Sequence, residues 1–132
     1  MANQSLRSSR KKVLVVEDDL RQLLVSIVAL VKCSKVDVDS TDRADTAVML
    51  VRKATFDLVI MDIRLPGFGR TDSGIEAIQR IRDFNKEIPI LVISAYPDMY
   101  EGAALKAGAN KFLPKTLPME EIVRIIEEYL ER

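Results

Sequence analysis

The side chains best suited to chemistry in this sequence follow short apolar runs that lie far apart along the chain. They are Glu17, Asp18 and Asp19 after residues 13–16, Asp62 after 58–61, Ser94 after 90–93 and Lys115 after 112–113. Carboxylates set close together repel one another, so an acidic cluster at the end of a buried strand requires a compensating cation or a capping role. The chemistry of the site therefore depends on which of these groups the fold brings together.

Oxygen ligands without nitrogen or sulfur ligands favour a hard divalent cation. The chain contains no histidine, and its one cysteine, Cys33, lies in an apolar helical stretch. Carboxylates in such a site favour Mg²⁺, which keeps some of its waters and usually bridges to phosphate. Asp62 can attack phosphorus through a carboxylate oxygen and form an acyl phosphate. Mg²⁺, the Lys115 ammonium and the Ser94 hydroxyl could then stabilise the negative charge of the transferring group.

Each of these residues also has a structural explanation. Asp19 stands just before Leu20, where an N-cap role is favoured over metal ligation. Lys115 alone would be a solvated lysine, and Ser94 alone a turn hydroxyl. Asp62 is harder to explain in this way, because a carboxylate that closes the apolar run LVIM is either buried at a cost or functional.

Short apolar runs alternate with amphipathic segments along the whole chain. Strands are predicted over residues 13–16, 36–38, 58–61, 90–93 and 112–113, and helices over 20–31, 43–54, 75–84, 99–107 and from Pro118 to 130. Runs of this length bounded by polar residues are typical of strands that are buried on both faces. Five such units indicate an open, doubly wound α/β sheet with right-handed crossovers, in which ligands bind outside the carboxyl ends of the strands.

Several residues mark the expected helix ends. Asp42 and Asp98 are predicted to start two of the middle helices, and Ser73 with Glu76 forms a capping-box pattern before a third. Gly108 is expected at a helix C-terminus. These signals place the candidate site residues in the strand-to-helix connections.

Composition restricts the class of protein. The 132 residues are 48% hydrophobic and 30% charged, which suits one globular domain, here predicted over 12–132 after a flexible tail over 1–11. The 20 basic residues equal the 20 acidic ones, so no global field favours direct nucleic-acid binding. No secretion signal or membrane-spanning run is evident. The single cysteine is expected to be a small buried apolar residue rather than part of a disulfide, which indicates a reducing compartment. We therefore expect a cytoplasmic protein.

The sequences VLVVEDD, DLVIMDIRLPG, ILVISAY and GANKFLPK resemble the receiver domain of two-component response regulators over about residues 12–131. The resemblance implies a flavodoxin-like five-stranded parallel sheet with strand order 2-1-3-4-5 and five helices. It implies a phosphorylation-driven signalling switch, a phosphoacceptor that catalyses only its own phosphorylation and dephosphorylation.

The resemblance also assigns roles to individual residues. Asp62 would accept a phosphoryl group, while Glu17, Asp18, Asp62 and the backbone carbonyl of Arg64 would hold Mg²⁺. Ser94 and Lys115 would bind the phosphoryl group, and Phe112 matches an aromatic switch position that turns inward as Ser94 moves toward the phosphate. Ala95 is small and would leave Asp62 accessible.

The partners follow from the same resemblance and from composition. Because the chain has no histidine, the phosphoryl donor must be another protein or domain, a histidine kinase or a histidine phosphotransfer protein. A downstream output domain or protein would read the switched face. Members of the family often form dimers through the fourth helix, fifth strand and fifth helix, so a homodimer is one possible arrangement that the resemblance implies. The chain is expected to be either a stand-alone receiver or a piece of a larger regulator or hybrid kinase.

The sequence departs from the family pattern in three places. Thr116 follows Lys115 where proline is common, so the preceding peptide bond is either trans or a costly cis bond. Phe112 lacks the hydroxyl of the commoner tyrosine. The stretch GFGRTDSG reaches Gly74 later than the family pattern, which indicates an insertion near Phe68 to Ser73.

Two readings of the insertion remain open. Surface loops lengthen at small cost, so it can be neutral, or Phe68 and Arg70 can contact a kinase or output partner. Arg64 and Tyr96 each lie two residues beyond a site residue, and we hypothesise that they shield the acyl phosphate from water.

Two other functions also remain open. One is a receiver-like interaction module that works without phosphorylation. The other is a phosphohydrolase with an aspartyl nucleophile, which would usually place a second Asp where this chain has Arg64.

Overall fold

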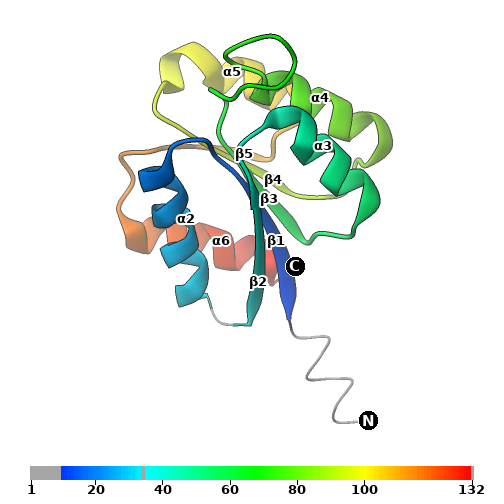
Figure 1. The fold of residues 1–132 in the computed structure, drawn as a ribbon. Helices are drawn as coiled ribbons and strands as arrows, with labels where there is room; N and C mark the ends of the chain where they lie inside the picture. Colours follow the sequence, from blue (N-terminus) through cyan, green and yellow to red (C-terminus); the bar gives the residue numbers. More distant parts are fainter. Residues whose placement is uncertain (1–9, 34, 132) are drawn as a thin grey trace.

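The computed structural model describes residues 10–33 and 35–131, and it contains one five-stranded sheet in the order β2-β1-β3-β4-β5 (Figure 1). The strands are β1 (Lys11–Val16), β2 (Val36–Thr41), β3 (Leu58–Met61), β4 (Ile90–Ser94) and β5 (Lys111–Pro114). The helices are α2 (Leu20–Lys32), α3 (Ala44–Lys53), α4 (Gly74–Phe84), α5 (Pro97–Ala107) and α6 (Met119–Leu130). Every strand pair is parallel, which confirms the predicted topology.

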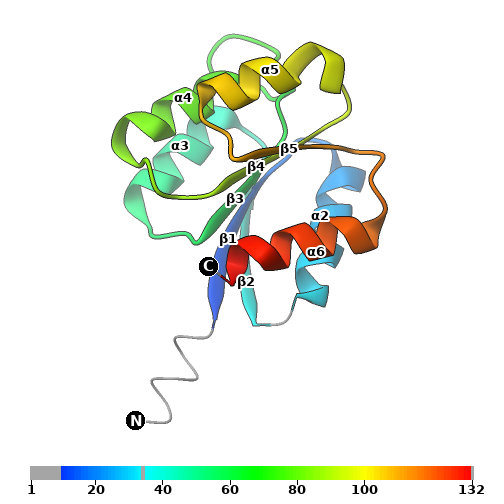
Figure 2. The same cartoon turned by 180° about the vertical axis from the view of Figure 1, so that it is seen from behind.

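Helices cover both faces of the sheet because the central strands are apolar on both sides. Leu14 and Val16 of β1 pack with α3, α4 and α5 on one face, whereas Val13 and Val15 pack with α2 and α6 on the other. Figures 1 and 2 show these two helical layers from opposite sides. Only the edge strand β2 alternates between half-buried and exposed residues, because solvent reaches one of its faces.

Two predicted helix ends are confirmed. The Asp19 side chain accepts hydrogen bonds from the backbone N–H groups of Arg21 at 2.9 Å and Gln22 at 3.3 Å, and thus caps α2. Gly108 ends α5 at φ 124°, a conformation that side chains other than glycine rarely adopt.

The other start signals were wrong in position, or, for Ser73 at the N-cap of α4, in bonding. Helix α3 begins after Arg43 rather than Asp42, and the Ala44 N–H is satisfied by the Pro66 carbonyl at 2.9 Å instead of by a capping side chain. Ser73 precedes α4 but forms no cap bond, because its hydroxyl serves the preceding loop. Asp98 lies inside the first turn of α5, which Pro97 opens.

The ends of the domain also differ slightly from expectation. Strand β1 begins at Lys11 rather than Val13, so Lys11 does not belong to the predicted tail. Arg10 forms an exposed ion pair with Asp37 of β2, which extends the ordered edge by one residue. Residues 1–9 of that tail lie outside the described residues. Pro118 is the N-cap of α6 rather than a residue of its first turn.

Cys33 is buried at the end of α2, as predicted. Its thiol donates to the Ala29 carbonyl at 3.3 Å, and burial, with a smaller contribution from Glu127, raises the pKa of the thiol to about 11. The thiol therefore behaves as a packing group with little thiolate character near neutral pH. Within the described residues, no helix is long and apolar enough to cross a lipid bilayer.

Candidate functional site

The carboxyl ends of β1 and β3 bring the predicted acidic residues together. These strands are neighbours, and the Asp62 N–H donates to the Val16 carbonyl at 3.0 Å, so Asp62 lies beside the start of the Glu17–Asp18 segment. One carboxylate oxygen from each of Glu17, Asp18 and Asp62 lies within 4.8 Å of the other two. Asp19 points to its own helix, which separates the capping carboxylate from the other three.

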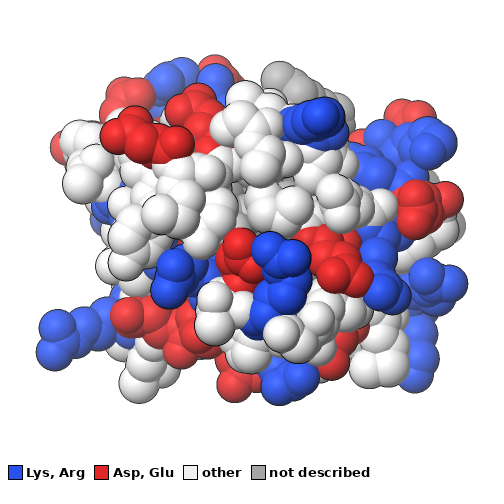
Figure 3. Space-filling view, turned by 90° about the horizontal axis from the view of Figure 1, so that it is seen from above, with Lys and Arg blue, Asp and Glu red and all other residues white. Residues whose placement is uncertain are grey.

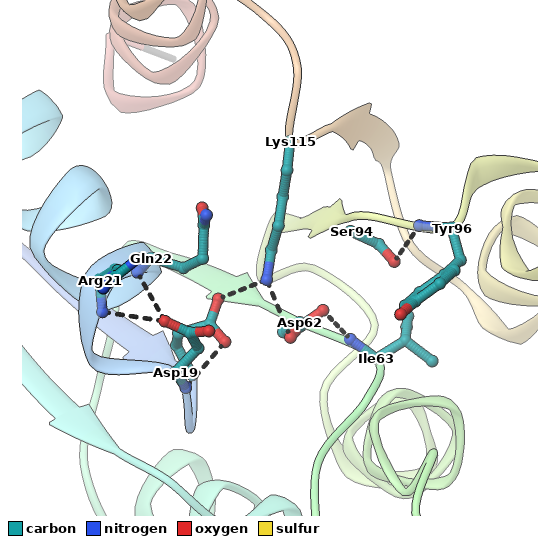
Figure 4. Close-up of polar contacts among 9 residues, drawn as sticks. Asp19, Arg21, Gln22, Asp62, Ile63, Ser94, Tyr96 and Lys115 are labelled. Carbon is teal, nitrogen blue, oxygen red and sulfur yellow. Dashed lines mark hydrogen bonds and ion pairs between the residues drawn. The ribbon is translucent and has the colours of Figure 1, made fainter.

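Lys115 enters this cluster from the loop after β5. Its Nζ lies 3.2 Å from Glu17 Oε1 and 3.2 Å from Asp62 Oδ2, as Figure 4 shows for Asp62. The backbone N–H of Lys115 donates to the Ser94 carbonyl at 2.9 Å and holds the loop against β4. Burial lowers the pKa of Lys115, but the adjacent Asp62 and Glu17 carboxylates outweigh it and raise this pKa above its usual value. The lysine is therefore a stable cation at this site.

The acidic cluster still carries more negative charge than Lys115 offsets. Burial first, and then the Asp62 carboxylate, raise the pKa of Glu17 to about 7, although Lys115 acts in the opposite direction. Burial likewise raises the pKa of Asp18. Three carboxylates around one ammonium thus favour a further cation.

The donor atoms of the cluster fit Mg²⁺. All three are carboxylate oxygens, and Asp18 is exposed, so the site is open to solvent on one side. Mg²⁺ prefers such oxygen ligands and retains several waters, which an open site allows.

A cavity of about 480 Å³ opens above Asp62 and Lys115. Ala95 and Tyr96 from the loop after β4 line it, and so does Arg64. The Arg64 guanidinium lies over the Tyr96 ring at 5.4 Å from its centroid and donates to the Tyr100 hydroxyl at 3.4 Å. The two side chains expected to shield Asp62 therefore contact each other at the mouth of the cavity.

Figure 3 shows this carboxyl edge of the molecule in space-filling form. Acidic and basic side chains lie next to each other near the middle of the face, with no large area of one sign. This mixture agrees with the formal net charge of zero.

Ser94 and Asp62 each form hydrogen bonds to nearby backbone. The fully buried Ser94 hydroxyl accepts from the Tyr96 N–H at 3.2 Å, and Asp62 Oδ1 accepts from the Ile63 N–H at 2.8 Å (Figure 4). Phe112 is buried among the residues that pack beneath α5, including Tyr100. The aromatic residue at the expected switch position is thus buried in this structure.

The peptide bond between Lys115 and Thr116 is trans, as are all others in the described part of the chain. The sequence left a trans or a cis bond open at this position. The trans bond avoids the energetic cost of a cis peptide bond before a residue other than proline.

Two residues of the inserted loop were not predicted to belong to the site. Arg70 and Thr71 line the same cavity as Asp62. From the sequence, Arg70 was predicted only as a possible contact with a partner. No feature of GFGRTDSG indicates the direction in which the loop folds. Phe68, which the sequence marked as a partner contact together with Arg70, is partly buried against the core.

Comparison with known proteins agrees with this geometry. The family model of the response regulator receiver domain matches residues 13–127. The chain belongs to this family. The receiver is 33% identical over 119 residues to the transcriptional regulatory protein ZraR of Klebsiella oxytoca, an alignment that covers 89% of this chain and 26% of that regulator. It is 32% identical over 121 residues to the response regulator protein PilR of Pseudomonas aeruginosa, again across 89% and 26% of the two chains.

Solved structures show the same fold. The receiver domain of sensor histidine kinase PA1611 from Pseudomonas aeruginosa, which holds a magnesium ion in its active-site cleft, superposes with a TM-score of 0.81 at 25% identity over 93% of this receiver and 99% of that domain. A putative response regulator from Chloroflexus aurantiacus has a TM-score of 0.81 at 27% identity, with the same coverage. The receiver described here spans about a quarter of the length of ZraR and PilR.

Proposed function

We propose that this receiver accepts a phosphoryl group on Asp62 in a reaction that depends on Mg²⁺. The observation that carries the proposal is the position of Asp62, which is 6% exposed at the end of β3 between the Glu17–Asp18 carboxylates and the Lys115 ammonium. A carboxylate buried in this way is costly unless it is paired or functional.

The transfer itself is a substitution at phosphorus. A carboxylate oxygen of Asp62 forms a bond to the phosphorus of a phosphohistidine, the P–N bond breaks, and its electron pair returns to the imidazole nitrogen of the donor, which takes up a proton. Lys115 neutralises charge on the transferring group through its ammonium. Mg²⁺, when bound, supplies further neutralisation of the phosphoryl oxygens.

The remaining residues have proposed roles that follow the family pattern. Glu17, Asp18 and the Arg64 backbone carbonyl hold Mg²⁺ together with Asp62. Ser94 turns its hydroxyl from the Tyr96 N–H to a phosphoryl oxygen, and Phe112 is the aromatic switch residue that responds to that movement. The family's magnesium-bound member supports the metal assignment.

The proposed phosphoryl donor and output are other proteins or domains. This chain contains no histidine, so a histidine kinase or a histidine phosphotransfer protein provides the phosphoryl group in the cytoplasm. A downstream domain or protein reads the phosphorylated state, and α5, β5 and α6 form the face through which two copies would pair.

The test is intact-mass measurement after incubation with acetyl phosphate, with and without Mg²⁺. We expect the wild type to gain one phosphoryl group only with Mg²⁺, and Asp62→Asn to gain none. Asp83→Asn removes an exposed carboxylate on α4 and should behave as wild type.

The two other functions give different results in the same experiment. An interaction module that works without phosphorylation would show no mass gain and no Mg²⁺ binding. A phosphohydrolase would release many equivalents of phosphate per protein, which Arg64 at the position of the second acid argues against.

A further inference from the structure

The inserted loop between β3 and α4 has a defined conformation. Ser73 is completely buried and connects both ends of the loop: its hydroxyl accepts from the Phe68 N–H at 3.0 Å and donates to the Arg70 carbonyl at 3.1 Å. Its own N–H donates to the Leu65 carbonyl at 3.0 Å. These hydrogen bonds fix the position of the loop backbone from which the Arg70 side chain extends.

Two further contacts attach the loop to the domain. The Phe68 ring packs against the core and lies 4.3 Å from the Arg80 guanidinium of α4. Gly67 adopts φ +155° so close to α3 that an added Cβ would lie 2.8 Å from the Asp45 nitrogen. The loop is thus held on both sides while its tip, Arg70 and Thr71, faces the cavity above Asp62.

Arg70 is a cation of this cavity whose guanidinium is mostly open to solvent. Lys115 is held between two buried carboxylates, and Arg64 is stacked on Tyr96. Among the residues that the structure describes, Arg70 forms an ion pair with Asp72 alone, at 2.9 Å, and 65% of the Arg70 side chain is exposed to solvent. An exposed pair of this kind contributes little to stability and is easily exchanged.

We propose that Arg70 leaves Asp72 and pairs with the phosphoryl group when Asp62 is phosphorylated, so that the inserted loop senses the phosphorylated state. The inference rests on the proposed function of Asp62. A phosphoryl group carries about two negative charges and three acceptor oxygens, so it attracts a guanidinium more strongly than the single charge of a carboxylate does.

The exchange would also change a neighbouring surface. Arg70 and Asp72 both line a groove between α4 and α5, together with Glu76 and Met99. Departure of Arg70 leaves the Asp72 carboxylate unpaired on that groove, which becomes more negative. Phosphorylation at the carboxyl edge of the sheet thereby alters a second face of the domain.

Beryllofluoride with Mg²⁺ is a suitable probe because it mimics a phosphoryl group on an aspartate. We expect Arg70→Ala to weaken its binding by roughly threefold to tenfold in calorimetry, as for loss of a charge-assisted pair near the surface. Arg70→Lys, which keeps the charge without the fork, should be intermediate. In ¹⁵N NMR of the wild type, the Arg70 Nε–H signal should shift on binding.

A double-mutant cycle with Asp72 tests the exchange itself. Asp72→Asn frees Arg70 and should strengthen beryllofluoride binding, and this gain should disappear in the Arg70→Ala background. Arg43→Ala is the matched control, because Arg43 forms the same kind of exposed pair with Asp45, at 3.1 Å, away from the cavity.

The outcomes separate the two proposals. Wild-type affinity in Arg70→Ala, or an Arg70 signal that does not move, would overturn the role of Arg70 alone. A wild type that gains no phosphoryl group and binds no beryllofluoride would overturn both this role and that of Asp62.

Discussion

At the scale of single residues, Asp62 lies beside a buried ammonium and below a cation–aromatic contact. Lys115 lies 3.2 Å from its carboxylate, while Arg64 and Tyr96 contact each other above the same cavity. A cation over an aromatic ring holds both side chains in place. The proposed attraction by Lys115 and the hypothesised shielding by Arg64 and Tyr96 therefore involve different residues and can be tested separately by substitution.

We predict that Arg64→Ala and Tyr96→Ala shorten the lifetime of the phosphorylated protein by about threefold or more. Each substitution removes one half of the contact and admits water to the acyl phosphate, and a barrier lower by about 1 kcal/mol corresponds to such a change. The loss of mass-detected phosphoprotein over time measures it. Unchanged decay in both variants would show that the contact does not shield Asp62.

At the scale of elements, the start of α4 packs closely against the backbone of Asp62 and Ile63. A Cβ on Gly74 would lie 2.4 Å from the Asp62 carbonyl oxygen and 2.7 Å from Ile63 Cα. The Gly74 N–H also donates to the Ile63 carbonyl at 3.1 Å. Because backbone atoms form this contact, no side-chain rotation can relieve an added methyl group.

We therefore predict that Gly74→Ala lowers the free energy of unfolding by about 1–3 kcal/mol through overpacking, and displaces Asp62. Urea denaturation measures the first effect, and slower phosphorylation by acetyl phosphate measures the second. Gly102→Ala in α5 is the control, because nothing lies within 4 Å of the added methyl group. It should stabilise the protein by about 0.5–1 kcal/mol through helix propensity, and a loss in Gly102→Ala equal to that in Gly74→Ala would contradict the explanation.

At the scale of the whole molecule, one sheet joins two separate apolar layers. Ile81 of α4 is fully buried in the layer formed with α3 and α5, and Ile126 of α6 is fully buried in the layer formed with α2. The two layers pack on opposite faces of the same strands. The two layers should therefore unfold together.

We predict that Ile81→Ala and Ile126→Ala each lower the free energy of unfolding by about 2–5 kcal/mol. The two losses should add to within about 0.5 kcal/mol in the double variant, with a single transition in urea followed by circular dichroism. Val31→Ala, at a position 72% exposed on α2, should cost far less. Two separate transitions in either single variant would mean that the layers unfold independently.

The sequence alone determined the features that depend on near neighbours. Apolar runs such as 58–61 predicted the central strands, since a strand buried on both faces needs apolar residues at consecutive positions. Asp19 was identified as a cap because its carboxylate bonds to N–H groups two and three residues away. Parallel strands align their carboxyl ends, so the meeting of Glu17, Asp18, Asp62 and Lys115 also followed from the pattern together with the family resemblance.

Only the tertiary structure decided the contacts between distant segments. The Ala44 N–H is satisfied by the carbonyl of Pro66, so no capping residue marks the start of α3 in the sequence. The Ser73 hydroxyl bonds to the loop before it, which a capping-box pattern does not reveal. Arg70 reaches the cavity of Asp62 because of those loop bonds. Loop direction and site electrostatics depend on which groups the fold brings close in space, and local sequence carries little information about that.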